Sequence, residues 1–272
     1  MKLSIVLSTQ PTQFQAATLS GELEPSIAQI AAFGYQGVEL AIRNPDLVNI
    51  DALASVVRKY NLVVPAIGTG QAWNDERISF TDPDPAIRRA AIERIESHIP
   101  VAARFNAVII IGLIRGMLLP GMDEKQAMSI LCEGIQECCR AAQPFGVKLA
   151  LEPINRYECS LINTFTQGLS LVNNVAEENF GLLLDTFHMN IEEPGIETSV
   201  QSCGDRLFHF HVADSNRWYP GAGHLDFSSI LGSLQKIGYE GFVSGEFLPM
   251  PDPITAASRN IEYLKALLRS NS

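Results

Sequence analysis

Short apolar runs alternate with longer amphipathic segments along the whole chain. Eight such runs are rich in Val, Ile and Leu, and they span residues 3–7, 37–41, 62–67, 107–112, 148–152, 181–185, 207–212 and 241–246. Each run is continuously apolar rather than alternating, which is typical of parallel strands covered on both faces. The pattern therefore predicts eight parallel strands.

Segments with the spacing of amphipathic helices follow these runs. They span residues 27–33, 50–60, 85–105, 123–145, 166–174, 197–203, 227–237 and 254–268. Glycines stand just past three of the predicted helix ends, where a left-handed cap is common: Gly34, Gly146 and Gly238. The predicted N-caps are Asp123, Thr166 and Asp226.

Eight strand–helix units in 272 residues match the size of a (β/α)8 TIM barrel. An open, doubly wound sheet is the alternative, but it has fewer strands and usually a glycine-rich fingerprint after the first one. Here the first strand runs into Ser8-Thr9-Gln10-Pro11, without such a fingerprint. We therefore expect residues 1–272 to form a single α/β domain, a TIM barrel.

Charge and composition disfavour several classes of partner. The formal net charge of −10 argues against nucleic acid, because a phosphate backbone requires a basic surface. The longest apolar runs are too short to span a bilayer, and the N-terminal segment lacks the long apolar region of a signal peptide. The five cysteines form no CxxC pair, which fits a reduced protein. We expect a cytoplasmic protein without a membrane partner.

Four consecutive predicted strands carry metal-ligand residue types at their carboxyl ends: Glu152, Asp185, His211 and Glu246. In a TIM barrel this end holds the active site. A carboxylate that follows a buried run is costly unless it is paired or bound to a metal. A single strand-end acid is usually a helix cap or a surface group, but four at the same end are hard to explain by chance. The oxygen-rich set suits Mn2+, Mg2+ or Co2+ better than a structural zinc.

Two further polar residues are expected to support this site. His209 shares a strand face with His211, one layer deeper, and we expect a hydrogen-bonded interior residue rather than a ligand. Phe208, like Phe210 and Val212, is expected to face the helices. Glu39, at the end of the second strand, is expected to have a structural or supporting role.

Three long motifs carry a family resemblance. They are Glu152-Pro-Ile-Asn-Arg-Tyr-Glu158, Asp185-Thr-Phe-His188-Met-Asn, and His211-Val-Ala-Asp-Ser-Asn-Arg217 followed by Pro-Gly-Ala-Gly-His224. Ile67-Gly-Thr-Gly-Gln71-Ala and Ile110-Ile-Gly-Leu-Ile-Arg115-Gly agree in the first half. The chain resembles the xylose-isomerase-like sugar isomerases and epimerases, and within them the ketose 3-epimerases.

The resemblance implies roles for individual residues. Glu152, Asp185, His211 and Glu246 match the metal ligands, and Glu152 and Glu246 also match the pair that moves the proton. The residues implied to contact the substrate are Glu158, His188 and Arg217, and Gln71 is a further candidate for such a contact. Many ketose 3-epimerases have a second arginine after the one that Arg217 matches, whereas Trp218 and Tyr219 follow here, which weakens transfer of the sugar specificity.

These roles predict inversion of carbon 3 of a ketose or keto-uronate. One carboxylate takes a proton from the carbon beside the carbonyl and a second returns one on the opposite face, while a divalent ion, Mn2+ first and Zn2+ also possible, stabilises the enediolate. The phrases IGTGQA, DTFHMNIEE and HFHVADSNRW resemble epimerases that interconvert 5-keto-L-gluconate and D-tagaturonate. Arg115, Arg156 and Arg217 are candidates to hold a uronate carboxylate. For Arg115 and Arg156, a structural ion pair is the alternative.

Other functions stay open at this point. An aldose–ketose isomerase, of the hydroxypyruvate isomerase type, could use the same ligands, and a neutral ketose could be the substrate. A DNA-repair endonuclease of the same superfamily would need more than the five histidines present and a less acidic chain. A barrel that only binds a ligand would not need the full set of four metal-ligand residues. By analogy with related barrels, the protein could form a homo-oligomer.

Overall fold

The computed structural model describes residues 1–12, 16 and 18–270. Eight parallel strands close into a barrel, in chain order, because the last strand pairs with the first. They are β1 (Lys2–Ser8), β3 (Glu39–Ala41), β4 (Ala66–Gly68), β5 (Val108–Ile111), β6 (Leu149–Leu151), β7 (Phe180–Asp185), β8 (Leu207–Val212) and β9 (Phe242–Gly245). A two-residue strand, β2 (Leu19–Ser20), pairs with the end of β1. The eight predicted strands and the TIM barrel are confirmed.

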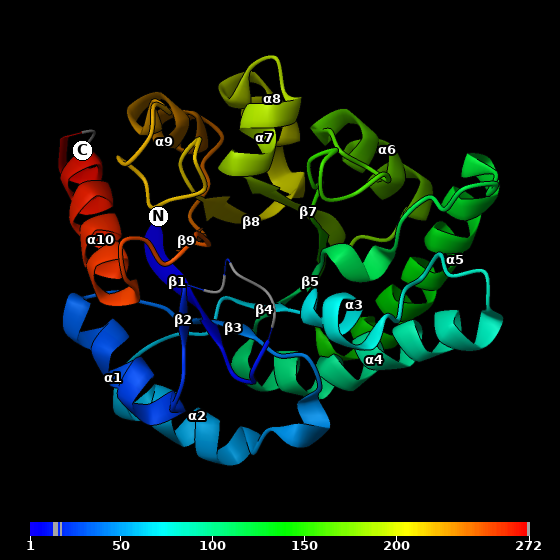
Figure 1. Cartoon of the computed structure of the whole chain (residues 1–272), viewed down its shortest axis with the longest axis horizontal. Helices are drawn as coiled ribbons and strands as arrows, with labels where there is room; N and C mark the ends of the chain where they lie inside the picture. Colours follow the sequence, from blue (N-terminus) through cyan, green and yellow to red (C-terminus); the bar gives the residue numbers. More distant parts are fainter. Residues whose placement is uncertain (13–15, 17, 271–272) are drawn as a thin grey trace.

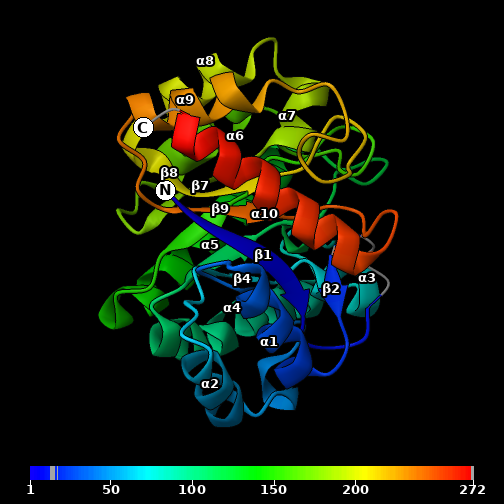
Figure 2. The same ribbon diagram turned by 90° about the vertical axis from the view of Figure 1, so that its left-hand side faces the viewer.

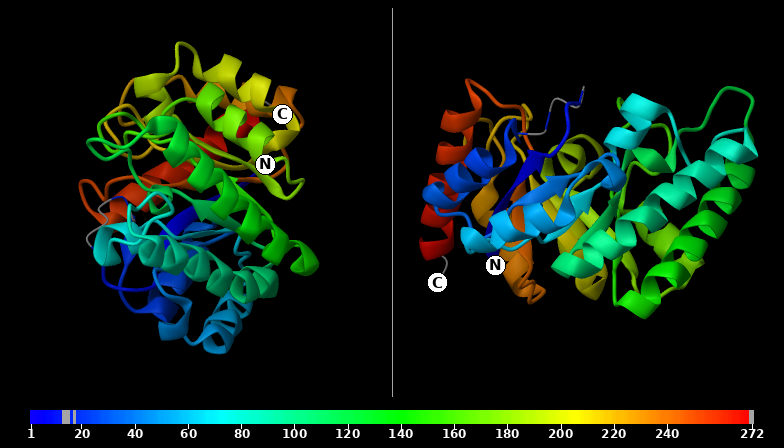
Figure 3. Two further views of the ribbon diagram at one scale, coloured as in Figure 1. Left: turned by 90° about the vertical axis from the view of Figure 1, so that its right-hand side faces the viewer. Right: turned by 90° about the horizontal axis from the view of Figure 1, so that it is seen from below.

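Helices surround the barrel, and the two ends of the described chain lie on one side of it (Figures 1 and 2). The helices are α1 (Leu23–Phe33), α2 (Ile50–Lys59), α3 (Gln71–Glu76), α4 (Pro85–Phe105), α5 (Glu124–Ala142), α6 (Phe165–Val175), α7 (Thr186–Glu192), α8 (Ile196–Cys203), α9 (Phe227–Lys236) and α10 (Pro253–Ser270). The long helices α4 and α5 pack against each other on the outside (Figure 3). Within the described residues, no helix combines the length and the apolar character needed to cross a membrane.

All eight predicted helices are present, and the helices that the sequence missed are short. α3 and α7 have six and seven residues and follow the carboxyl ends of β4 and β7, where they border the site. Asp123 and Asp226 cap α5 and α9 as predicted. The predicted Thr166 cap was wrong, because Thr164 caps α6. The Thr164 side chain accepts from the backbone N–H of Gln167, and the Gln167 side chain accepts from the backbone N–H of Thr164.

Two of the clusters that form the core bear on the orientation of β8. The larger lies between the strands and the helices and contains Phe210 and Val212, as predicted for β8. A smaller cluster inside the barrel consists of Ala66, Ile110, Ala150 and Leu183. Phe208 packs against this interior cluster, so its predicted orientation toward the helices is wrong. The register between β7 and β8 shifts between Leu182 and Leu183, and this irregularity breaks the simple alternation along β8.

Candidate active site and metal centre

The four predicted metal-ligand side chains meet at the carboxyl ends of four consecutive strands. Glu152 and Glu246 directly follow β6 and β9, Asp185 ends β7 and His211 lies within β8. One ligand atom from each lies within 4.8 Å of all the others. His211 Nδ1 is 3.4 Å from Glu246 Oε2, 3.7 Å from Asp185 Oδ2 and 3.8 Å from Glu152 Oε1.

Two of the atoms in this cluster that could bind a metal have no hydrogen-bond partner among the described residues. Among the described residues, His211 Nδ1 and Glu152 Oε1 are buried without one. Buried polar atoms are nearly always paired, since leaving one unpaired is costly. Three carboxylates and one imidazole that converge in this way fit a divalent cation, and the cluster is a candidate metal-binding site.

Asp185 combines two roles that the sequence left as alternatives. Its Oδ1 accepts from the backbone N–H groups of Phe187 and His188, at 2.7 and 3.3 Å, and so caps α7. Its Oδ2 faces His211 in the cluster. A strand-end aspartate can therefore begin the next helix with one oxygen and present the other to a metal.

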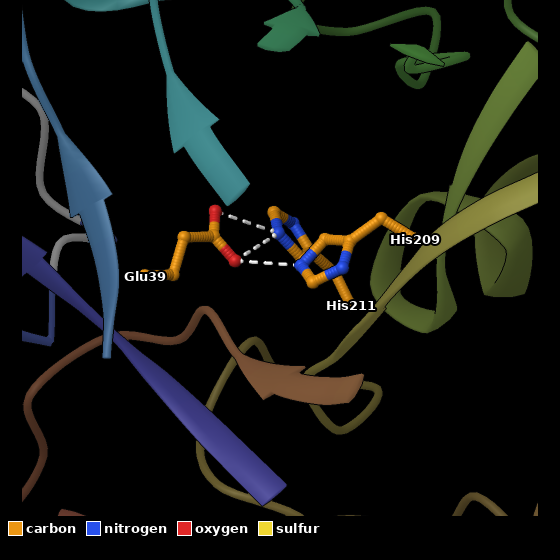
Figure 4. A group of neighbouring side chains, drawn as sticks. All are labelled: Glu39, His209 and His211. Carbon is orange, nitrogen blue, oxygen red and sulfur yellow. Dashed lines mark hydrogen bonds and ion pairs between the residues drawn. The ribbon is translucent and has the colours of Figure 1, made fainter. Parts of the chain in front are cut away.

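Glu39 and His209 form a second group of side chains with His211, in which the Glu39 carboxylate faces both imidazole rings (Figure 4). Glu39 accepts from His209 Nε2 at 2.8 Å and from His211 Nε2 at 3.0 Å, and all three side chains are buried. These contacts confirm His209 as a hydrogen-bonded interior residue and give Glu39 the supporting role expected of it, although the sequence did not predict that the two would pair. The three residues also lie close enough together to hold a metal ion. With Nε2 protonated toward Glu39, the lone pair of His211 Nδ1 points into the four-residue cluster.

Burial and mutual repulsion shape the electrostatics of the cluster. Burial raises the pKa of Asp185 to about 7, and it also raises the pKa of Glu152. Burial opposes a charge on His211, but the carboxylates of Glu39 and Glu246 outweigh it and raise the pKa of this imidazole. Without a cation, the cluster therefore holds protons that a metal ion would displace.

A pocket opens next to these ligands, and the predicted substrate contacts line it. Gln71, Glu158, His188 and Arg217 all do so. Asn155, which the sequence analysis missed, connects three of them. Its amide donates to His188 Nδ1 at 2.8 Å and to Glu158 Oε1 at 2.9 Å, and Arg217 donates to the same Glu158 oxygen at 2.7 Å. The only signal for Asn155 was its place inside the Glu152–Glu158 motif.

Arg115 and Arg156, two of the three candidates to hold a substrate carboxylate, are not among the residues that line the pocket. Arg115 is fully buried and donates to the backbone carbonyls of Gly112, Glu152, Leu161 and Ile162. Its donors are used to fix the loop after β6 and the Glu152 backbone. The half-exposed Arg156 instead forms a bidentate ion pair with Glu192, at 2.9 and 2.7 Å.

Comparison with known proteins places this barrel in a class. Residues 27–267 match the model of the family described as xylose isomerase-like TIM barrel. The chain is 32% identical over 224 residues to L-ribulose 3-epimerase of Methylomonas sp. (strain DH-1), covering 81% of this chain and 77% of that protein. It is also 32% identical over 224 residues to D-psicose 3-epimerase of Ruminiclostridium cellulolyticum, covering 80% and 75%.

Solved structures agree with this placement. The crystal structure of D-allulose 3-epimerase from Methylomonas sp. in complex with D-allulose matches with a TM-score of 0.82 and 27% identity over 97% of both chains. The protein therefore belongs to the xylose isomerase-like TIM barrels and, within them, to the ketose 3-epimerase group of sugar epimerases.

Proposed function

We propose that this protein inverts carbon 3 of a ketose or keto-uronate, counted from the end nearest the carbonyl, with a bound divalent cation. The observation that carries the proposal is the convergence of three carboxylates and His211 around unpaired donor atoms, in a chain of the ketose 3-epimerase group. Glu152, Asp185, His211 and Glu246 would hold the ion, with Mn2+ proposed first. When bound, the cation supplies Lewis-acid stabilisation of negative charge on the substrate oxygens.

Glu152 and Glu246 are proposed to move the proton. They follow strands that are not adjacent, which allows one carboxylate on each face of a sugar in the pocket. Burial raises the pKa of Glu152, which brings this carboxylate closer to the range useful for a general base near neutral pH. One glutamate takes the proton from carbon 3 and the other returns a proton to the opposite face.

His188 and Arg217 are proposed to orient the substrate oxygens. Because the Asn155 amide donates to His188 Nδ1, the imidazole proton resides on Nε2, which lies 3.9 Å from Glu152 Oε1. Burial and the nearby arginines lower the pKa of His188, so the ring stays neutral and acts as a single hydrogen-bond donor. Glu158 fixes Arg217 through one nitrogen and leaves the other donors of the guanidinium for a substrate oxygen.

We further propose that 5-keto-L-gluconate and D-tagaturonate are the preferred substrates, as for a 5-keto-L-gluconate epimerase. Two observations support this proposal. The phrases IGTGQA, DTFHMNIEE and HFHVADSNRW resemble such enzymes. Arg217 is the only arginine or lysine among the described residues that line the pocket, and it would take the role first assigned to three arginines.

Metal depletion and add-back would test both proposals. Chelated protein is restored with Mn2+, Mg2+, Co2+ or Zn2+ and incubated with D-tagaturonate, 5-keto-L-gluconate, D-tagatose, D-fructose or L-ribulose, and the products are separated by chromatography. We expect a 3-epimer only after metal addition, with kcat/KM at least tenfold higher for the keto-uronates. An aldose product would identify an isomerase instead, and a preference for neutral ketoses would contradict the substrate proposal.

A further inference from the structure

Gln71, the first residue of α3, carries an unpaired acceptor into the pocket. The side chain is 2% exposed and lines the cavity. Its Oε1 is buried and has no hydrogen-bond partner among the described residues. Its Nε2, by contrast, donates to the hydroxyl of Ser8 at 2.9 Å. One half of the amide is therefore anchored to β1, and the other half has no partner in the part of the chain that the structure describes.

The Ser8 hydroxyl determines how the amide nitrogen and oxygen of Gln71 are oriented. Ser8 has one hydroxyl proton, and it donates this proton to the backbone carbonyl of Gln10 at 2.7 Å. Toward Gln71 the Ser8 oxygen can only accept, so the amide nitrogen of Gln71 must face it. A flipped amide would place two acceptors against each other. The carbonyl oxygen of Gln71 is thus held in one orientation by a chain of two hydrogen bonds.

Among the described residues, those that line the pocket from the β4 side are uncharged. Gly68, Gly70 and Leu113 line it, and the hydroxyl of Thr69 is already used because it donates to the carbonyl of Ile110 at 2.6 Å. The metal-ligand side chains come from β6 to β9, whereas Gln71 follows β4. Gln71 therefore lies on a different part of the barrel rim from the metal-ligand side chains.

We propose that Gln71 Oε1 accepts a hydrogen bond from one substrate hydroxyl outside the reacting carbons and thereby selects sugars that carry it. This inference rests on the proposed function. A hydroxyl can donate to this oxygen, whereas an ionised carboxylate or a deoxygenated carbon cannot. A keto-uronate bound here places its carboxylate elsewhere, toward Arg217, and presents one of its hydroxyls to Gln71.

Deoxy sugars and two variants would test this selection. The rate of 3-epimerisation is measured on D-fructose and on its 4-deoxy, 5-deoxy and 6-deoxy analogues, for the wild type, Gln71→Met and Ser8→Ala. Gln143→Met, in an exposed turn after α5, is the matched control. We expect Gln71→Met to lower kcat/KM about 10- to 100-fold on D-fructose and less than about threefold on the one analogue that lacks the recognised hydroxyl. The control should match the wild type on every sugar.

Ser8→Ala provides a second and milder perturbation. Without the Ser8 acceptor the amide of Gln71 is free to turn, so the ratio of kcat/KM between D-fructose and that same analogue should fall toward one. Equal losses on all four sugars in Gln71→Met, or no loss on any, would overturn the selection by Gln71 while leaving the epimerase proposal intact. A wild-type protein that is fully loaded with metal and epimerises no ketose would overturn the proposed function itself, and the selection with it.

Discussion

Replacing Glu39 by glutamine removes the charge below His211 while it keeps the size of the side chain. Glu39 accepts from His209 Nε2 at 2.8 Å and from His211 Nε2 at 3.0 Å, so both imidazoles carry their proton on Nε2 (Figure 4). Glutamine offers one acceptor and one N–H2 group at this place. At least one imidazole must then face a donor, or move its proton to Nδ1, which for His211 is the ligand atom.

The size of the effect follows from similar supporting contacts in metalloproteins. Loss of such a partner typically weakens metal binding about 10- to 100-fold, or about 1.4–2.8 kcal/mol. We expect Glu39→Gln to lower Mn2+ affinity by this factor, measured by competition with a chelator of known affinity. The exposed Glu133→Gln, on α5, is the control and should bind like the wild type.

The same titration also counts the bound ions. We expect one ion per chain, because Glu39 and His209 support His211 rather than bind a second metal. A Glu39→Gln affinity within twofold of the wild type, with normal circular dichroism, would refute the supporting role. Two ions per chain in the wild type, reduced to one in the variant, would show that Glu39, His209 and His211 form a metal site of their own.

Three further predictions follow from the site. Arg115→Met removes the guanidinium that donates to four buried backbone carbonyls, and it should cost at least about 3 kcal/mol of unfolding free energy. Arg156→Met should cost less than about 1 kcal/mol and leave KM for keto-uronates unchanged. Denaturant titration and kinetics check both variants, and a selective rise in KM would restore a role in carboxylate binding. Glu152→Gln and Glu246→Gln should each lower the rate of epimerisation about 10²–10⁴-fold. Each variant should still exchange the carbon-3 proton with solvent when the substrate is the epimer whose proton faces the remaining glutamate. Near-normal turnover by either fully metallated variant would exclude the two-base scheme. Burial raises the pKa of Asp185 from an ordinary 3.8 to about 7, so stability is lost as the pH rises from about 4 to about 7, and the loss levels off above that. The melting temperature of chelated protein should therefore fall between about pH 5 and about pH 7 relative to the Mn2+-loaded protein. A difference between the two melting temperatures that stays constant or narrows would contradict this.

Local sequence patterns predicted most of the barrel and its metal-ligand cluster. An apolar run that ends in an acid or imidazole is visible in the sequence, and the alternation of strands and helices brings such ends together at one face. Glu152, Asp185, His211 and Glu246 could be found in this way. The inward position of His209 followed from the two-residue period of a strand, whereas its pairing with Glu39 became visible only in the structure.

The features that the sequence did not predict depend on contacts between distant segments. Arg115 is a candidate for an anion in isolation, but the loop after β6 folds back and places the carbonyls of Leu161 and Ile162 on it. The orientation of Phe208 differs from the predicted one because of a register shift between β7 and β8, which no local sequence pattern encodes. A single domain over all 272 residues, a homo-oligomer and a cytoplasmic location stay predictions.

The exchange of the proton at carbon 3 tests the central claim most directly. Mn2+-loaded protein is incubated in D2O with D-tagaturonate, and separately with D-tagatose, and the products are followed by NMR. We predict deuterium at carbon 3, counted from the end nearest the carbonyl, together with the appearance of the 3-epimer, and neither in chelated protein. A new epimer that retains the original hydrogen at carbon 3, or turnover that is unaffected by chelation, would contradict it.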